Sequence, residues 1–109
     1  MNCPTEIKQL LKVLYNLSSS ETEVLYYLCS NEARASEIAD ELGKDRSTIQ
    51  RYLSKLQSTG LLQRESMVEE GKRGRYYVYS VPDKEKLKEK VRVRMDEWAD
   101  EKLEVLEDI

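Results

Sequence analysis

The stretch Ala35-Ser-Glu-Ile-Ala-Asp-Glu-Leu-Gly-Lys-Asp-Arg-Ser-Thr-Ile-Gln-Arg-Tyr-Leu-Ser54 decides the fold. Two helices that cross near a right angle need a small residue at their contact, a turn residue between them and apolar anchors on both. Ala39 supplies the small residue, Gly43 the turn, and Asp45 is placed to cap the second helix. The apolar anchors are Ile38, Leu42, Ile49 and Leu53. The stretch therefore predicts a helix-turn-helix, whose second helix runs to about Ser58.

Two further helices are expected ahead of this motif. Pro4 suits the first turn of one helix, because apolar residues then repeat at spacings of three and four. These residues are Ile7, Leu10, Leu11, Leu14 and Leu17. Three serines interrupt the repeat, and Ser20 with Glu23 has the spacing of a capping box for a second helix ending near Asn31. Ser36 then precedes the short first helix of the motif.

After Gly60 the pattern changes to that of strands. Residues 61–68 and 75–81 are rich in Leu, Val and Tyr and are separated by a polar segment with two glycines, which predicts a β-hairpin. Pro82 and Asp83 precede a long helical segment that runs to the end of the chain. The predicted class is mainly α with a small β-hairpin: a winged helix-turn-helix domain over residues 1–82 and a C-terminal dimerisation helix over residues 83–109.

Composition argues against an enzyme and against a membrane protein. The 109 residues allow one domain, and the chain has no histidine, no CxxC pair, no glycine-rich phosphate loop and no nucleophile elbow. We therefore expect no catalytic site, no metal and no cofactor. No apolar run approaches the length of a membrane span, and no signal peptide is recognised, so a cytoplasmic protein is expected.

The net charge of −3 hides a basic middle segment. Residues 1–43 carry 3 basic and 7 acidic side chains, residues 44–76 carry 8 and 4, and residues 77–109 carry 7 and 10, which gives −4, +4 and −3. A local basic face is what contacts to nucleic-acid phosphates require, and an acidic remainder does not prevent them.

The helix over residues 45–58 has an outward face without carboxylates. At about 100° per residue, Leu53 and Leu56 lie within about 40° of Ile49, which is taken to face the core. The opposite face and its flanks contain only Ser, Thr, Gln, Arg and Lys, which offer hydrogen-bond donors to base edges and phosphates. Such a surface favours a major-groove recognition helix, with Arg51 and Gln50 as base-contacting residues.

The segment from Ala35 through Leu56-Gln-Ser-Thr-Gly60-Leu61-Leu62 and the hairpin resembles prokaryotic winged helix-turn-helix transcriptional regulators, in particular the MarR and archaeal TrmB-like groups. The resemblance covers about residues 20–81. It departs at Lys44, where many members have an apolar residue, and it lacks the acidic residue common in the MarR wing, so the TrmB-like group is the closer match. The resemblance implies a sequence-specific regulator of transcription that binds double-stranded DNA.

The hairpin tip, residues 69–76, carries three cations within four residues and would form the wing, contacting the phosphate backbone or the minor groove. The predicted DNA contacts are Arg46, Ser47, Thr48, Gln50, Arg51, Ser54, Lys55, Lys72, Arg73 and Arg75. Two alternatives stay open. One is an edge hairpin kept soluble by its charges, and the other is a stacking platform for single strands made by Tyr52, Tyr76, Tyr77 and Tyr79, although hairpin tyrosines that alternate between core packing and the sheet surface are the simpler interpretation. Glu69 and Glu70 weaken the DNA interpretation, because they would repel phosphate.

The C-terminal helix is too long to bury its apolar stripe on so small a domain, which predicts self-association. Residues 84–94 hold six cations against two acids and residues 96–108 hold seven acids against one cation, so two antiparallel copies would pair opposite charges across a two-fold axis. The predicted contacts are Leu87, Val91, Met95, Trp98, Leu106 and Ile109. A monomer whose helix folds back on the domain is the alternative. A two-fold homodimer predicts a pseudo-palindromic operator.

Two other functions are consistent with the sequence. A winged helix can serve as a protein adaptor within the transcription machinery, its basic face docking an acidic partner. A thiol-based redox sensor could use Cys3, if it lies near a mobile N-terminus, whereas Cys29 has core neighbours. The sequence identifies no small-molecule effector.

Overall fold

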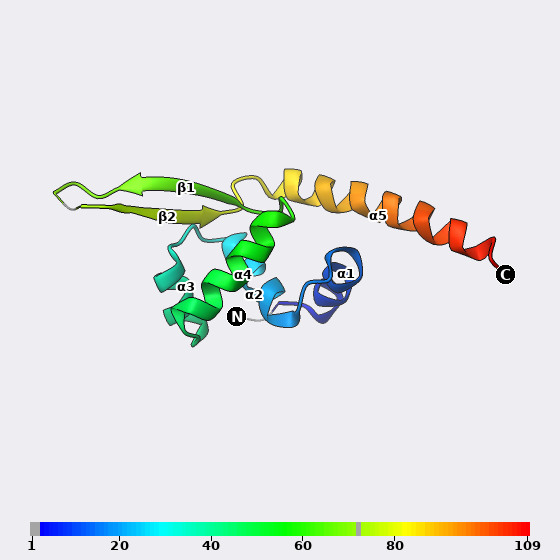
Figure 1. Ribbon diagram of the computed structural model, residues 1–109, viewed down its shortest axis with the longest axis horizontal. Helices are drawn as coiled ribbons and strands as arrows, with labels where there is room; N and C mark the ends of the chain where they lie inside the picture. The colour runs from blue at the N-terminus through cyan, green and yellow to red at the C-terminus, as the bar shows by residue number, and fades with distance from the viewer. Residues whose placement is uncertain (1–2, 72) are drawn as a thin grey trace.

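The computed structural model describes residues 3–71 and 73–109, and within them the elements follow the expected order (Figure 1). They are α1 (Thr5–Tyr15), α2 (Ser19–Leu28), α3 (Ala35–Leu42), α4 (Arg46–Ser58), β1 (Gln63–Val68), β2 (Arg75–Ser80) and α5 (Lys84–Leu106). The first four helices pack together, and the hairpin and α5 extend from them in opposite directions, so that the molecule measures 63 × 24 × 22 Å. The predicted class, mainly α with a small β-hairpin, is confirmed.

The helix-turn-helix forms where the sequence predicts it. Gly43 ends α3 with a φ of 65°, in the left-handed region where a side chain would be strained. The Lys44 backbone N–H then donates to the Ala39 carbonyl oxygen at 2.9 Å. Asp45 caps α4, because its carboxylate accepts the Thr48 backbone N–H at 3.1 Å. These local interactions fix where α4 begins.

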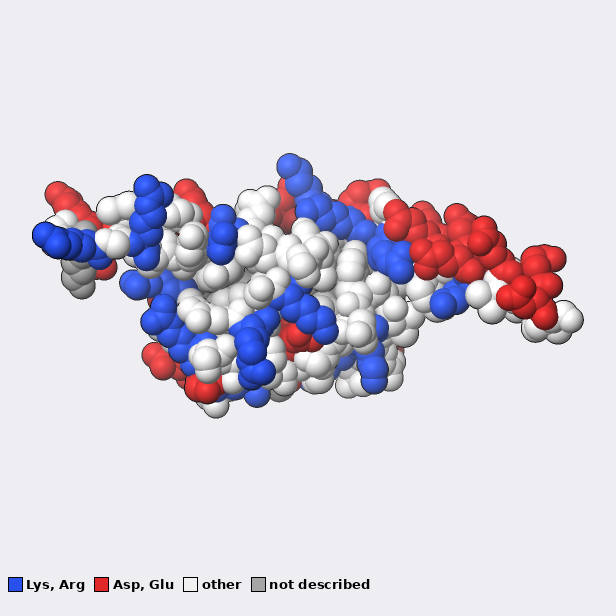
Figure 2. Space-filling view, viewed as in Figure 1, with Lys and Arg blue, Asp and Glu red and all other residues white. Residues whose placement is uncertain are grey.

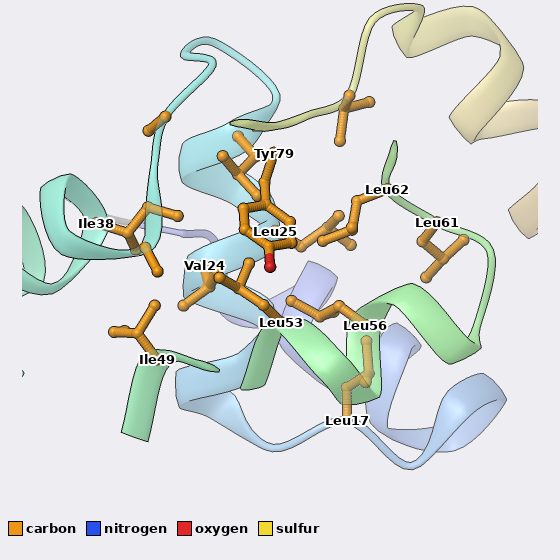
Figure 3. Close-up of a cluster of buried hydrophobic side chains, with 14 of the residues drawn as sticks. Leu17, Val24, Leu25, Ile38, Ile49, Leu53, Leu56, Leu61, Leu62 and Tyr79 are labelled. Atoms are coloured by element: carbon orange, nitrogen blue, oxygen red, sulfur yellow. The ribbon is translucent and has the colours of Figure 1, made fainter. Parts of the chain in front are cut away.

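One hydrophobic core holds α2, α3 and α4 together and reaches the base of the hairpin (Figure 3). The side chains with at most 1% exposure include Leu17, Val24, Ile38, Ile49, Leu53 and Leu56. Ile49, Leu53 and Leu56 are the residues of α4 predicted to face inward, and all three are buried. The orientation of α4 about its own axis is therefore set by this core.

The capping box of α2 is formed at Ser18 and not at the predicted Ser20. It is formed by Ser18 and Glu21: Ser18 Oγ accepts the Glu21 backbone N–H at 3.1 Å, and Glu21 Oε1 accepts the Ser18 backbone N–H at 2.7 Å. Glu23 instead pairs with Lys8 at 2.8 Å. The helix starts early because the chain turns at Asn16, and Leu17 enters the core directly before it. It also ends earlier than expected, at Leu28 rather than near Asn31.

The hairpin projects into solvent from a fixed base. Leu61 and Leu62 are buried in the core, so β1 begins at Gln63 rather than at residue 61. The strands pair antiparallel from Gln63 opposite Ser80 to Val68 opposite Arg75, and every β1 residue is exposed. The backbones of Ala33 and Tyr79 exchange two hydrogen bonds of 2.8 and 3.0 Å. This bridge holds the base of the hairpin beside the start of α3.

The first half of α5 packs on the domain and the second half leaves it (Figure 1). The Asp83 carboxylate caps the helix by accepting the backbone N–H groups of Glu85 and Lys86. Lys90 Nζ donates to the Gly60 carbonyl oxygen at 2.7 Å, and Arg94 Nε donates to the Leu14 carbonyl oxygen at 3.1 Å. The second half of α5 does not fold back over the domain, whereas Leu87 and Val91 in the first half pack on its core. Across the described residues, no helix combines the length and apolarity needed to cross a membrane.

Candidate nucleic-acid interface

The outward face of α4 is polar, cationic and accessible. The exposed side chains of this helix are Arg46, Ser47, Gln50, Arg51, Ser54 and Ser58, and Thr48 is half-buried. Arg51 Nη2 donates to Thr48 Oγ1 at 3.3 Å, which orients the guanidinium along the helix surface. Because α4 runs from residue 46 to 58, the whole helix is free of carboxylates.

Asp45, the one acid at the start of this helix, is held by internal hydrogen bonds. The side-chain and backbone hydrogen bonds from Thr48, and a hydrogen bond from Ser47 Oγ at 3.2 Å, keep the pKa of the Asp45 carboxyl below its ordinary value. A carboxylate at the N-terminus of a helix is also favoured by the helix dipole. Its predicted role as a cap is confirmed.

The hairpin presents a second group of cations (Figure 2). Arg73 and Arg75 are exposed, and Arg75 Nη1 donates to Ser66 Oγ at 3.4 Å across the strands. Lys72, the third predicted wing cation, lies outside the described residues. Figure 2 shows Lys and Arg side chains over α4 and along the hairpin on one face of the molecule, whereas Asp and Glu gather over the far half of α5.

Two further arginines, which are not among the predicted contacts, lie at the hairpin. The Arg34 guanidinium lies 4.2 Å from the centre of the Tyr76 ring, and that of Arg64 lies 4.1 Å from the centre of the Tyr77 ring. Such stacking fixes a guanidinium while its edge stays free to donate. Strand alternation could have indicated Arg64. It lies opposite Tyr79 in the hairpin, and Tyr77, two residues along the same strand, is on the same face and within reach of a long side chain. Arg34 comes from another element, and no local pattern indicates it.

The same contacts weigh against a stacking platform made by the tyrosines. Tyr79 is buried in the core. Tyr76 and Tyr77 each have a guanidinium over the ring. The hairpin tyrosines thus serve packing and the positioning of arginines.

Lys55 differs from the other predicted contacts on α4. Its ammonium donates to Glu21 Oε1 at 3.0 Å and to the Asn16 carbonyl oxygen at 2.7 Å, so it joins α4 to the start of α2. Glu21 is 7% exposed. Burial works to raise the pKa of the Glu21 carboxyl, but the hydrogen bonds from Ser18 and Lys55 outweigh it and hold that pKa below its ordinary value. The Lys55 ammonium is therefore bound to acceptors within the domain itself.

Neither cysteine has the surroundings of a reactive thiol. Cys3 is 8% exposed, so its thiol is buried rather than accessible. Burial raises the pKa of the Cys3 thiol and of the Cys29 thiol, which disfavours the thiolate that oxidants attack. In the described part of the chain, no group of three or more acidic or thiol side chains is arranged to hold a metal ion.

The residues predicted to form a dimer contact fall into two groups on α5. Leu87 and Val91 are half-buried and pack against the core of their own chain. Met95, Leu106 and Ile109 are exposed at 44%, 57% and 103%, and Trp98 is half-buried.

Comparison with known proteins identifies the family. Residues 11–85 match the family described as sugar-specific transcriptional regulator TrmB, which is more than half of the chain. The uncharacterized protein MJ1082 of Methanocaldococcus jannaschii is 30% identical over 93 residues, covering 84% of this chain and 76% of that protein.

Solved structures share the fold. A possible transcriptional regulator from Methanosarcina mazei Go1 has a TM-score of 0.80 at 23% identity, covering 94% of this chain and 87% of that one. A mutant of Lactococcus lactis ZitR in complex with DNA has a TM-score of 0.53 at 17% identity, covering 85% of this chain and 62% of that one. The chain therefore belongs to the TrmB family, and it is a DNA-binding transcriptional regulator of the winged-helix class rather than an enzyme.

Proposed function

We propose that this protein binds specific sequences in double-stranded DNA as a homodimer, with α4 in the major groove and the hairpin wing on the phosphate backbone or in the adjacent minor groove. One observation carries the proposal: the carboxylate-free face of α4 and the arginines of the hairpin lie on the same face of the molecule (Figure 2). The solved complex of ZitR with DNA supports this use of the fold.

In this proposal the two cationic groups have different tasks. Arg51 and Gln50 are exposed on α4 and carry bidentate donors, which suit guanine and adenine edges in the major groove. Arg73 and Arg75, with Arg34 and Arg64 beside the hairpin tyrosines, suit phosphate oxygens. Ser47, Thr48 and Ser54 are placed for shorter contacts, and a two-fold dimer would recognise a pseudo-palindromic operator.

Arg51→Ala is expected to reduce sequence discrimination more than overall affinity. Loss of a bidentate base contact removes about 1–3 kcal/mol of discrimination against the wrong base, and binding to random duplex changes less. Fluorescence anisotropy on a duplex obtained by selection from random sequences, compared with its scrambled version, measures the ratio. Arg51→Lys is the matched control: it keeps the charge but not the paired donors, so it should lose specificity as Arg51→Ala does.

The double variant Arg73→Ala with Arg75→Ala is expected to weaken binding to all duplexes alike. Each lost phosphate contact lowers the slope of log affinity against log salt by about 0.9, so the slope should fall by about two. The double lysine variant at the same positions should keep the slope of the parent. An unchanged slope in the alanine variant would show that the wing does not contact DNA. If no variant lost DNA affinity and the protein formed a stable complex with another protein, the adaptor function would be favoured instead.

A further inference from the structure

The two faces of the hairpin differ in charge. Side chains alternate between the two sides of a strand, so the strand pairing shows which of them share a side. One side, the Arg64 face, carries Arg64, Ser66, Val68, Arg75, Tyr77 and Tyr79. The other side, the Tyr76 face, carries Gln63, Glu65, Met67, Tyr76, Val78 and Ser80. Within strand residues 63–68 and 75–80, all of which the structure describes, the Arg64 face has two cations and no acid, and the Tyr76 face has one acid and no cation.

On the Arg64 face, two guanidiniums are arranged around one tyrosine. The Arg64 guanidinium lies 4.1 Å from the centre of the Tyr77 ring. Ser66 lies opposite Tyr77, and its Oγ accepts a hydrogen bond from Arg75 Nη1 at 3.4 Å. Both arginines are exposed, and Tyr77 is 41% exposed. The hairpin's own residues therefore hold both guanidiniums in place and leave them open to an anion from outside.

The Tyr76 face is held by a residue from another element. Arg34 directly precedes α3, and its guanidinium lies 4.2 Å from the centre of the Tyr76 ring. The antiparallel bridge between Ala33 and Tyr79 puts Arg34 opposite Val78, and so on the Tyr76 face. Tyr76 is half-buried. The domain itself thus covers part of the Tyr76 face and leaves the Arg64 face open beyond the buried Tyr79.

We propose that the hairpin meets the phosphate backbone of DNA with its Arg64 face, and that Arg34 is a positioning residue that holds the Tyr76 face to the start of α3. This inference rests on the proposed function and deepens it. Both stacked guanidiniums suit phosphate by their chemistry, but the face that each occupies gives them different tasks. Arg64 lies beside Arg75 on a face without carboxylates, which attracts phosphate. Arg34 shares its face with Glu65, which repels phosphate.

Arg64→Ala and Arg34→Ala form a matched pair, because each removes one exposed cation that is stacked on a tyrosine. Arg64→Ala should lower the slope of log affinity against log salt by about 0.9 for each subunit and weaken binding to every duplex by roughly tenfold. Arg34→Ala removes the same charge but should leave the slope unchanged. It should weaken binding only about two- to fivefold, as expected for an exposed cation–π contact. Fluorescence anisotropy over a series of salt concentrations measures both variants.

A second measurement separates positioning by Arg34 from a general loss of stability. If Arg34 acts through the hairpin, Arg34→Ala should weaken binding no further once Arg64 and Arg75 are both alanine. Tyr76→Phe keeps the ring under the guanidinium and should bind as the parent does, whereas Tyr76→Leu should weaken binding as Arg34→Ala does. Circular dichroism of each variant checks that the chain is folded.

The two proposals fail in different ways. Equal slope changes in Arg64→Ala and Arg34→Ala, or an unchanged slope in Arg64→Ala, would overturn the assignment of the two faces, while salt-dependent binding of duplex by the parent would uphold the proposed function. A further loss of affinity from Arg34→Ala in the background without Arg64 and Arg75 would overturn the positioning role. A parent that binds no duplex at any salt concentration would refute the proposed function and this inference with it.

Discussion

Replacing Leu53 with alanine is expected to lower the free energy of unfolding by about 3 kcal/mol, within the range of about 2–5 kcal/mol for buried leucines. Leu53 is 1% exposed and lies in the core that joins α4 to α2 and α3 (Figure 3). The removed atoms lose their transfer free energy, and the close-packed neighbours cannot fully refill the space. Urea denaturation followed by circular dichroism measures the change.

Ser54→Ala, one position along the same helix, is the control for this prediction. Ser54 is exposed, so its replacement should change the free energy of unfolding by no more than about 0.5 kcal/mol. Equal effects at the two positions would mean that α4 is not oriented by its buried face. The consequence for function is direct, because the same core turns Arg51 and Gln50 outward.

The helix-turn-helix could be predicted from the sequence because its determinants are local. Asp45 caps the helix that follows it, Gly43 supplies the left-handed turn, and the buried positions of α4 repeat at helical spacing. Each of these signals acts within four residues, so neighbouring residues specify the structure before any long-range contact forms. The wing hairpin was predicted on the same grounds, through its glycines and its β-rich strands.

The parts that sequence reasoning missed depend on contacts between distant residues. Two serine–glutamate pairs, Ser18 with Glu21 and Ser20 with Glu23, have capping-box spacing. The first pair forms the cap because Leu17, directly before it, is buried in the core. Leu61 and Leu62 have the pattern of strand residues, but their side chains are buried in the core ahead of the first strand. Lys55 lies on the flank of α4, yet its ammonium is bound 34 positions away in the sequence at Glu21. The position of Arg34 above Tyr76 likewise needs the fold.

Glu21→Ala is expected to lower the free energy of unfolding at neutral pH by about 2 kcal/mol. The variant loses the reciprocal half of the capping box, worth about 1 kcal/mol, and it leaves the Ser18 backbone N–H and the Lys55 ammonium without this acceptor. The ion pair adds little more than about 1 kcal/mol, because Lys55 is 40% exposed and water screens it. Glu21→Gln keeps an oxygen for the Ser18 backbone N–H, so it should cost about half as much.

The effect should also depend on pH in a direction that the pKa shift fixes. The pKa of the Glu21 carboxyl is lowered in the folded chain, so its ionised form contributes stability that is fully present well above its ordinary pKa of about 4.3 and is lost as the pH falls through the folded-state value. Stability curves of the parent and of Glu21→Gln should therefore converge on acidification below that pKa and stay parallel above about pH 6. A constant gap between them at all pH values would show that the carboxylate charge contributes nothing, and that only the hydrogen bonds of Glu21 tie the start of α2 to α4.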